Sequence, residues 1–259
     1  MLPTVCAIAL MADAAESLYP AYNYRGVENY KLFKGLVFDG SEAAEYVIDL
    51  TEPVETTGLL SIGVKIFSIN SQGKTVFHYG ADVLLAKQKL PFLRYEHELP
   101  ALRRGGYLTK KPGANPPEIY QDGTLFHGEC LQGIRDIIRC DQDGLLLACQ
   151  LSESAQAKQG EFPLGKHNIF ADDLVYQAML VWVRQILGLG SLPSSTLSWL
   201  VYQPVSPIEP FYLKLDVTEQ KANTICADIS LISHDSQVLA VVKSATVTAS
   251  ENLKELFKC

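Results

Sequence analysis

Two segments that are apolar on every side restrict the fold of this chain most strongly. Residues 4–16 are rich in alanine and leucine, which favours a helix with Thr4 as its N-cap. Residues 173–183 predict a second helix of the same kind, capped by Asp172 or Asp173. A helix without a polar face must be enclosed by other elements rather than laid on a surface. Each of these helices is therefore expected at the centre of its own layer of strands.

Strand-like segments follow both helices in the same order. The alternating pattern predicts strands over residues 30–38, 45–51, 59–69 and 75–85 after the first helix, and over 198–202, 211–218, 224–232 and 238–248 after the second. The sequence Asn-Ser-Gln-Gly at residues 70–73 predicts a hairpin turn between the last two strands of the first set.

The two halves also resemble each other residue by residue. Residues 45–52 resemble residues 212–219, and the turn at 70–72 resembles 234–237, so the spacing is nearly constant. This pattern predicts an α+β double hotdog, in which two antiparallel sheets each wrap a central buried helix. The N-terminal hotdog would span residues 1–98, a linker rich in proline, glycine and basic residues 99–120, and the C-terminal hotdog 121–259. A generic α+β protein whose halves are alike by chance is the alternative.

Composition excludes several classes of protein. The net charge of −7 argues against a nucleic-acid binder and against a polybasic membrane-surface protein. No apolar stretch reaches the length of roughly 18–20 residues that a membrane span needs, and no basic residue precedes the first one as in a secretory signal. None of the six cysteines lies in a C-x-x-C pair, so we expect reduced thiols in a cytoplasmic protein, with Cys6, Cys149 and Cys226 in the core.

Asp173 and Gln177 are the side chains that best suit catalysis. They lie four residues apart and hence on one helix face. A helix start favours the carboxylate whereas an apolar pocket favours the neutral acid, and Gln177 can orient the carboxyl group. The alternative is an ordinary helix cap and an ordinary helix residue. A second candidate is His127 beside Gly128, which either lines a pocket or is structural. The histidines show no zinc-ligand spacing, and nucleophile-elbow and phosphate-loop motifs do not occur.

The chain resembles the dehydratase domains of polyketide synthases, and most closely those of bacterial polyunsaturated fatty acid synthases, over essentially its whole length. Residues 173–177 (Asp-Leu-Val-Tyr-Gln) resemble the family motif D-x-x-x-Q/H, and residues 126–132 resemble the segment read as YGPxFQ or FHGPxFQ. The sequence departs from these patterns at Glu129 and Leu131, and Asn168-Ile169 replaces the family's HP ahead of the aspartate.

The resemblance implies the removal of water from a 3-hydroxyacyl thioester carried on acyl carrier protein, with no metal or organic cofactor. A histidine would take the α-proton, Asp173 would protonate the leaving hydroxyl, and backbone N–H groups at a helix start would polarise the thioester carbonyl. Gln177 would orient the aspartate. The substrate tunnel would be lined by His127, Gly128, Tyr176 and Pro3.

The family's histidine belongs to the motif H-x-x-x-G-x-x-x-x-P, whose proline resembles Pro3. It would lie nine residues before Pro3, ahead of Met1. Either the sequence begins too late or the domain lacks the residue, and the isolated chain is expected to be inactive. The alternatives are a non-catalytic acyl-binding or product-template-like domain, or a hotdog thioesterase. Open water beside the carboxyl would favour the thioesterase, whereas a closed apolar tunnel with paired histidine and aspartate would favour dehydration.

The expected partners follow from the same resemblance. They are the carrier-bound substrate and the other domains of a multidomain synthase, with no nucleic acid and no membrane, and a homodimer is left open. The pairs Arg103-Arg104 and Lys110-Lys111 form either a local basic patch for an acidic carrier protein or a solvated linker.

Overall fold

Both segments predicted as buried helices are helical in the computed structural model, which describes residues 1–38, 45–56, 58–95, 118–151, 168–207 and 209–256. The first is α1 (Thr4–Leu18) and the second is α4 (Ile169–Trp182), and most side chains of both are buried. Helix α4 continues into a π-helical turn, η3 (Val183–Leu187), which ends at Gly188 with a φ angle of 70°.

The predicted helix caps were wrong at both helices. Pro3 precedes α1 without a side-chain cap, and Thr4 is the first helical residue, whose Oγ1 accepts a hydrogen bond of 3.3 Å from the Tyr30 hydroxyl. Asn168 caps α4, because its Oδ1 accepts from the backbone N–H of Ala171 at 3.2 Å. Asparagine serves this purpose as well as aspartate. Asp172 lies in the first turn of α4 and Asp173 directly after it, so neither precedes the helix as a cap does.

The strands of the first half are β1 (Asn23–Leu32), β2 (Val47–Leu50), β3 (Val54–Thr56), β4 (Leu59–Ile69) and β5 (Thr75–Ala86). The second half has β6 (Ile134–Asp141), β7 (Gly144–Cys149), β8 (Gly190–Val201), β9 (Phe211–Lys221), β10 (Thr224–Ser233) and β11 (Val238–Ser250). Short helices lie between and after these strands: η1 (Glu118–Tyr120), η2 (Glu129–Leu131) and α5 (Glu251–Leu256).

Two strand predictions were displaced, and three strands were not predicted. Strand β1 begins seven residues before the predicted start and ends at Leu32, because Asn29 has a φ angle of 53° and shifts the pairing register, which hides the alternation. Strand β8 begins at Gly190 rather than Ser198, since Pro193 and several serines give a weak strand signal. Strands β3, β6 and β7 are additions, whereas β4 has the predicted bounds.

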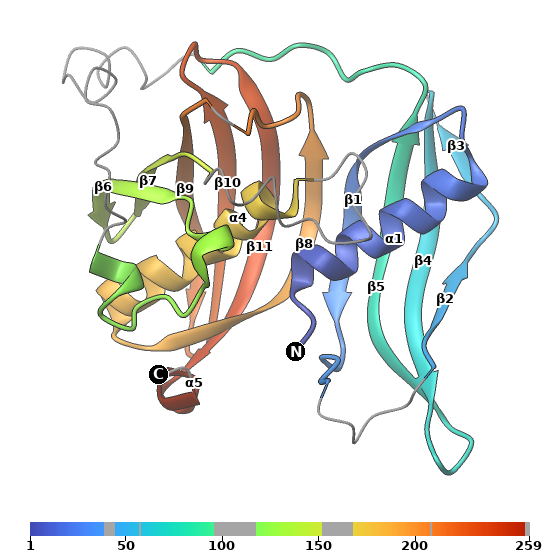
Figure 1. Ribbon diagram of the computed structural model, residues 1–259, viewed down its shortest axis with the longest axis horizontal. Coiled ribbons are helices and arrows are strands. Elements are labelled where there is room, and N and C mark those ends of the chain that lie inside the picture. The colour runs from blue at the N-terminus through green and yellow to red at the C-terminus, as the bar shows by residue number, and fades with distance from the viewer. Residues whose placement is uncertain (39–44, 57, 96–117, 152–167, 208, 257–259) are drawn as a thin grey trace.

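The described strands form one antiparallel sheet in the order β2-β4-β5-β1-β8-β11-β10-β9-β7-β6, with β3 paired to β4 beside this path (Figure 1). The order β2-β4-β5-β1 of the first half is mirrored by β9-β10-β11-β8 in the second. The halves meet where β1 pairs with β8, for example at Val27 opposite Trp199. We call this pairing the seam. The two sheets expected from the sequence are thus joined edge to edge.

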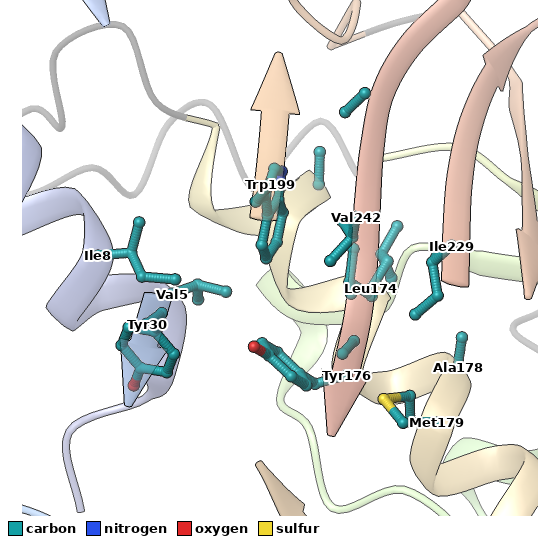
Figure 2. Packing of buried hydrophobic residues seen from close by; sticks show 14 of the residues in the cluster. Val5, Ile8, Tyr30, Leu174, Tyr176, Ala178, Met179, Trp199, Ile229 and Val242 are labelled. Carbon is teal, nitrogen blue, oxygen red and sulfur yellow. The ribbon is translucent and has the colours of Figure 1, made fainter. Parts of the chain in front are cut away.

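Each helix packs against the sheet of its own half, and both helices contribute to one core. Helix α1 contacts β1, β4 and β5, helix α4 contacts β7, β8 and β9, and the two helices also touch each other. Figure 2 shows Tyr176 and Trp199 at the centre of this core, between Val5 and Ile8 on one side and the residues of the second half on the other. Their ring centroids are 6.3 Å apart.

Three further expectations concern the cysteines, membrane-spanning helices and the basic pairs of the linker. Cys149 is buried, whereas Cys6 and Cys226 are half-buried, and the five cysteines in the described ranges are free thiols. Among the helices that the structure describes, none is long and apolar enough to cross a membrane. The basic pairs at residues 103–104 and 110–111 lie outside the described residues.

Candidate active site

A largely apolar cavity of about 300 Å³ lies between the starts of the two helices, beside the seam. Both halves contribute to its wall. The first half supplies Met1, Pro3, Thr4 and Leu32, and the second half supplies Phe126, His127, Gly128, Leu131, Asp173, Tyr176, Leu180, Ser191, Leu192, Pro193 and Val247. All the predicted site residues except Gln177 therefore line one cavity. Gln177 lies behind Asp173, away from the cavity surface.

Asp173 is held in one orientation by Gln177. It is 7 % exposed, and Gln177 Nε2 donates a hydrogen bond of 2.7 Å to Asp173 Oδ2, one helical turn away. The same amide nitrogen donates to the backbone carbonyl of Leu131 at 2.8 Å. Because both amide hydrogens are used, the amide cannot rotate without losing one of these bonds. The carboxyl group of Asp173 is consequently fixed against the cavity wall.

Tyr120 completes this support, although the predicted linker includes it. Its hydroxyl donates to Gln177 Oε1 at 2.7 Å and accepts from the backbone N–H of Ile134 at 3.1 Å. Tyr120 lies in η1 and Ile134 begins β6, so two short segments ahead of α4 anchor Gln177. Nothing in the local sequence signals this contact, because Tyr120 and Gln177 are 57 residues apart.

His127 faces Asp173 directly. Its Nε2 lies 3.4 Å from Asp173 Oδ2, and its ring stacks on that of Phe126 with centroids 4.6 Å apart. Gln132 Nε2 donates to the backbone carbonyl of His127 at 3.0 Å, which fixes the loop. Within the described residues, the buried His127 Nδ1 has no hydrogen-bond partner. The sequence predicted His127 either as a residue of the pocket wall or as a structural residue, and its contact with the carboxyl is an addition.

Burial shifts both groups of this pair toward their neutral forms. It raises the pKa of Asp173, and His127 and the Gln177 hydrogen bond offset part of that rise. Burial also lowers the pKa of His127, which the neighbouring carboxylate partly offsets. A neutral carboxylic acid can give up a proton, and a neutral imidazole can accept one.

Two other titratable groups lie close to Asp173. Burial, followed by the charge of Asp173, raises the pKa of Cys6 to about 11, so this thiol stays protonated and is a poor nucleophile near neutral pH. The same two causes raise the pKa of Asp172 to about 7. Asp172 lies on another side of α4 and lines a separate recess with Tyr24 and Asn168. The carboxyl groups of the adjacent residues Asp172 and Asp173 therefore lie in different surroundings.

Metal ligation has no support in the described ranges, where no group of three or more His, Cys, Asp or Glu side chains is placed to hold an ion. The titratable side chains that line the cavity are those of His127, Asp173 and Tyr176.

Comparison with known proteins shows the family of this chain. The family described as "Polyketide synthase dehydratase N-terminal domain" matches residues 118–256, which is more than half of the chain. The chain belongs to the polyketide synthase dehydratase family. The predicted family is thereby confirmed, and the matched region contains Asp173, Gln177, Tyr120 and His127.

One curated relative is similar over nearly the whole chain. The chain is 29 % identical over 255 residues to one polyunsaturated fatty acid synthase subunit from Thraustochytrium sp. (strain ATCC 26185 / S-3). The match covers 98 % of this chain and 9 % of the relative, so the chain spans less than a tenth of that protein.

Three solved dehydratase domains share the fold at low identity. The domain from the CurF module of the curacin polyketide synthase is 16 % identical with a TM-score of 0.68, covering 96 % of this chain and 84 % of that one. The domain of RzxB from Pseudomonas fluorescens is 14 % identical with a TM-score of 0.67, covering 95 % and 85 %. A trans-AT domain from Brevibacillus brevis is 19 % identical with a TM-score of 0.68, covering 96 % and 86 %. These likenesses confirm the predicted double-hotdog fold.

Proposed function

We propose that this dehydratase-family chain eliminates water from a 3-hydroxyacyl thioester delivered on an acyl carrier protein. One observation carries the proposal: a buried carboxyl, Asp173, is held by Gln177 at the wall of a largely apolar cavity and faces a histidine. An enoyl-isomerase of a trans-acyltransferase polyketide synthase shares the fold with a TM-score of 0.63 at 15 % identity. Because the fold alone does not select the reaction, the proposal depends on this site.

Asp173 is assigned the role of proton donor to the leaving hydroxyl. The bond between C3 and its oxygen breaks as the proton of Asp173 moves to that oxygen and water leaves. The electron pair of the C2–H bond forms the C2–C3 double bond, and the C2 proton passes to a base. A raised pKa supports this role, since it increases the fraction of Asp173 that holds a proton near neutral pH.

The start of α1 is the proposed position of the thioester carbonyl. No side chain caps this helix, and Thr4 in its first turn lines the cavity. Uncapped backbone N–H groups at a helix start favour a developing negative charge on oxygen, which makes the neighbouring C2 proton more acidic. In this scheme α1 polarises the substrate and α4 supplies the acid.

The cavity wall supports an acyl substrate and argues against hydrolysis. Leu131, Leu180, Leu192 and Val247 present apolar surface to the cavity. Asp173 is 7 % exposed, so little bulk water reaches the carboxyl, whereas a thioesterase needs a water molecule beside its catalytic group. Gln177 fixes the carboxyl group of Asp173, Tyr120 fixes Gln177, and the backbone N–H of Ile134 fixes Tyr120. A domain that only binds acyl chains would not need a carboxyl group held in this way.

The test is dehydration of a short 3-hydroxyacyl carrier protein, followed by mass spectrometry of the enoyl product. It compares the 259-residue chain with an N-terminally extended form that carries a histidine nine positions before Pro3. In whichever of these two forms dehydrates the substrate, Asp173→Asn is expected to lower the rate by about 10²- to 10⁴-fold, because the amide cannot donate the proton.

Asp172→Asn is the matched control. It makes the same chemical change at the adjacent position, on a side of α4 outside the cavity, and is expected to leave the rate unchanged. Full activity of a folded Asp173→Asn variant would contradict the proposal. Failure of both forms to dehydrate the substrate, with binding retained, would favour the non-catalytic alternative.

A further inference from the structure

We infer that the hydroxyl of Thr4 donates a hydrogen bond to the carbonyl oxygen of the substrate thioester, and that Tyr30 holds this hydroxyl in place. The inference rests on the proposed function, in which backbone N–H groups at the start of α1 polarise the carbonyl, and it adds a side-chain donor at that position. The proton acceptor stays where the family resemblance places it, ahead of Pro3.

The first argument is the position of Thr4. It is the first residue of α1, directly after Pro3, it is 6 % exposed, and it lines the same cavity as Asp173. In a 3-hydroxyacyl thioester, the carbonyl carbon and the carbon that bears the hydroxyl are separated by C2 alone. A donor for the carbonyl and an acid for the hydroxyl are therefore needed in one cavity, and α1 and α4 each supply one.

The second argument is the direction of the hydrogen bond between Tyr30 and Thr4. The hydroxyl of Tyr30 donates to Thr4 Oγ1 at 3.3 Å. A hydroxyl group carries one hydrogen and can accept at the same time, so Thr4 keeps its own hydrogen for another acceptor. Its oxygen does not cap α1, which has no side-chain cap. Among the residues that the structure describes, the Thr4 hydrogen has no protein acceptor, and it is left for a group inside the cavity.

The third argument is a comparison with Thr196, a buried threonine of the second half that also pairs with a tyrosine. The hydroxyls of Tyr176 and Thr196 are 2.7 Å apart, and either can donate. Thr196 is 1 % exposed and is not among the described residues of the cavity wall. Tyr30 lies opposite Thr196 across the seam, and Figure 2 shows both tyrosines in the core. One half thus keeps its threonine hydroxyl inside the core, whereas the other presents it to the cavity.

The surroundings of Thr4 strengthen it as a donor. Tyr30 is fully buried, and burial raises its pKa, which keeps its hydroxyl protonated and able to donate to Thr4. A hydroxyl that accepts a hydrogen bond becomes a better donor itself. Because the cavity is largely apolar, a hydrogen bond to a developing negative charge is stronger there than in water. Thr4 is therefore suited to bind an oxygen whose charge grows during the reaction.

The reaction step is balanced without consuming Thr4. As the base takes the C2 proton, the electron pair of the C2–H bond shifts toward the carbonyl oxygen, and the hydrogen bond from Thr4 strengthens. The pair then forms the C2–C3 double bond as the bond between C3 and its oxygen breaks, and the proton of Asp173 leaves with that oxygen as water. Thr4 keeps its own proton throughout.

The experiment measures kcat and KM of variants in whichever form of the chain dehydrates the carrier-bound substrate. Thr4→Val removes the hydroxyl and keeps the shape, and a loss of kcat by about 10²-fold is expected with little change in KM. Thr4→Ser keeps the hydroxyl and is expected to retain most of the rate. Tyr30→Phe removes the supporting hydrogen bond, and a loss of about tenfold is expected.

Thr196→Val is the matched control. It makes the same change at a buried threonine that pairs with a tyrosine outside the cavity wall. Both valine variants should lower the free energy of unfolding, whereas only Thr4→Val should lower kcat. An unchanged kcat for Thr4→Val, or an equal loss of kcat in Thr196→Val, would overturn the inference.

A binding measurement covers an inactive 259-residue chain and a Thr4→Val variant that does not fold. The probe is S-butyryl pantetheine with ¹³C in its carbonyl group, followed by NMR. A hydrogen bond to the carbonyl oxygen moves this signal downfield, so a shift is expected with the unmodified chain and with Thr4→Ser, and a smaller one with Thr4→Val or Thr4→Ala. A signal that stays at its free position, or that moves equally with all forms, would overturn the inference.

Failure of this inference and failure of the proposed function give different results. Full activity of a folded Asp173→Asn variant would refute the proposed function. An inactive Asp173→Asn variant together with a fully active Thr4→Val variant would leave the proposed function intact and remove only the role of Thr4.

Discussion

The two halves of the molecule build the same frame, but at two equivalent helix positions the first half has apolar residues and the second half has polar ones. Pro3 and Asn168 precede the two helices at equivalent places, so Ile8 and Ala12 of α1 correspond to Asp173 and Gln177 of α4. Ile8 and Ala12 pack in the core and need no partner. Asp173 and Gln177 need hydrogen bonds because they are equally buried.

The difference shows what a buried site requires of its surroundings. The partners of Gln177 are Tyr120 in η1 and the carbonyl of Leu131 in η2, two short helices that precede α4. The Asp173 carboxyl, the Gln177 amide, the Tyr120 hydroxyl and the Leu131 carbonyl form one hydrogen-bonded network, in which each group has a partner. The buried helix alone is therefore a scaffold. Polar side chains can be placed on it where segments outside the helix supply their hydrogen-bond partners.

The largest effect that tests this comparison is expected from Gln177→Ala, which gives α4 the residue found at Ala12 of α1. Loss of the bonds to Asp173 and Leu131 frees the carboxyl to rotate, so the dehydration rate should fall by about 10- to 100-fold. The control is Ile8→Val in α1, which should keep the rate and cost about 0.5–1.5 kcal/mol of stability. A Gln177→Ala rate equal to that of the control would break the comparison.

The seam gives the next prediction. Gly26 of β1 has a φ angle of 152°, and a Cβ atom added there would lie 2.0 Å from the carbonyl oxygen of Trp199 in β8. Gly26→Ala should therefore lower the free energy of unfolding by about 1–3 kcal/mol, measured by chemical denaturation.

A hairpin glycine is the matched control for the seam. Gly73 has a φ angle of 73° with no atom within 4 Å of an added Cβ, so Gly73→Ala should cost about 1 kcal/mol from its backbone conformation alone. Equal losses for the two variants would show that the halves do not depend on close contact at the seam.

The smallest effect concerns Asp172, whose counterpart in α1 is Ala7. The pKa of Asp172 is raised to about 7 in the folded chain, so the folded state holds this proton more tightly than the unfolded state does. The raised pKa makes ionisation of Asp172 destabilising, and the penalty grows as pH rises from about 4 to about 7.

Asp172→Asn should accordingly stabilise the chain by about 1–2 kcal/mol near pH 8, because Asp172 is only partly exposed and the helix start offsets part of the gain. Near pH 4 the same variant should have little effect, and thermal unfolding at the two pH values provides the measurement. An equal effect at both pH values would contradict the assignment of the shift to Asp172.

Local patterns in the sequence were sufficient for the elements that carry their signal within one segment. Helices α1 and α4 are apolar all round, and β4 alternates regularly, so all three were predicted. Strand β1 was displaced because Asn29 interrupts its alternation, and β7 was missed because Leu145, Leu146 and Leu147 form a continuous apolar run.

The candidate site was predictable in its residue types but not in its contacts. Asp173 and Gln177 lie one turn apart, so their hydrogen bond follows from helix geometry. The contacts of Tyr120 with Gln177 and of His127 with Asp173 join segments that are far apart in the chain, and only the folded sheet brings them together. The roles assigned to these residues stay predictions until the variants are measured.

The seam also fixes the dimensions of the cavity. Backbone hydrogen bonds between β1 and β8 link the two walls, and each is worth about 1 kcal/mol, so widening the space by separating the halves would break several at once. If the proposed function holds, the seam would resist a ligand that is too wide for the cavity. Side chains in the cavity wall, such as Leu180 and Leu192, would then limit the length of the acyl tail that the cavity accepts.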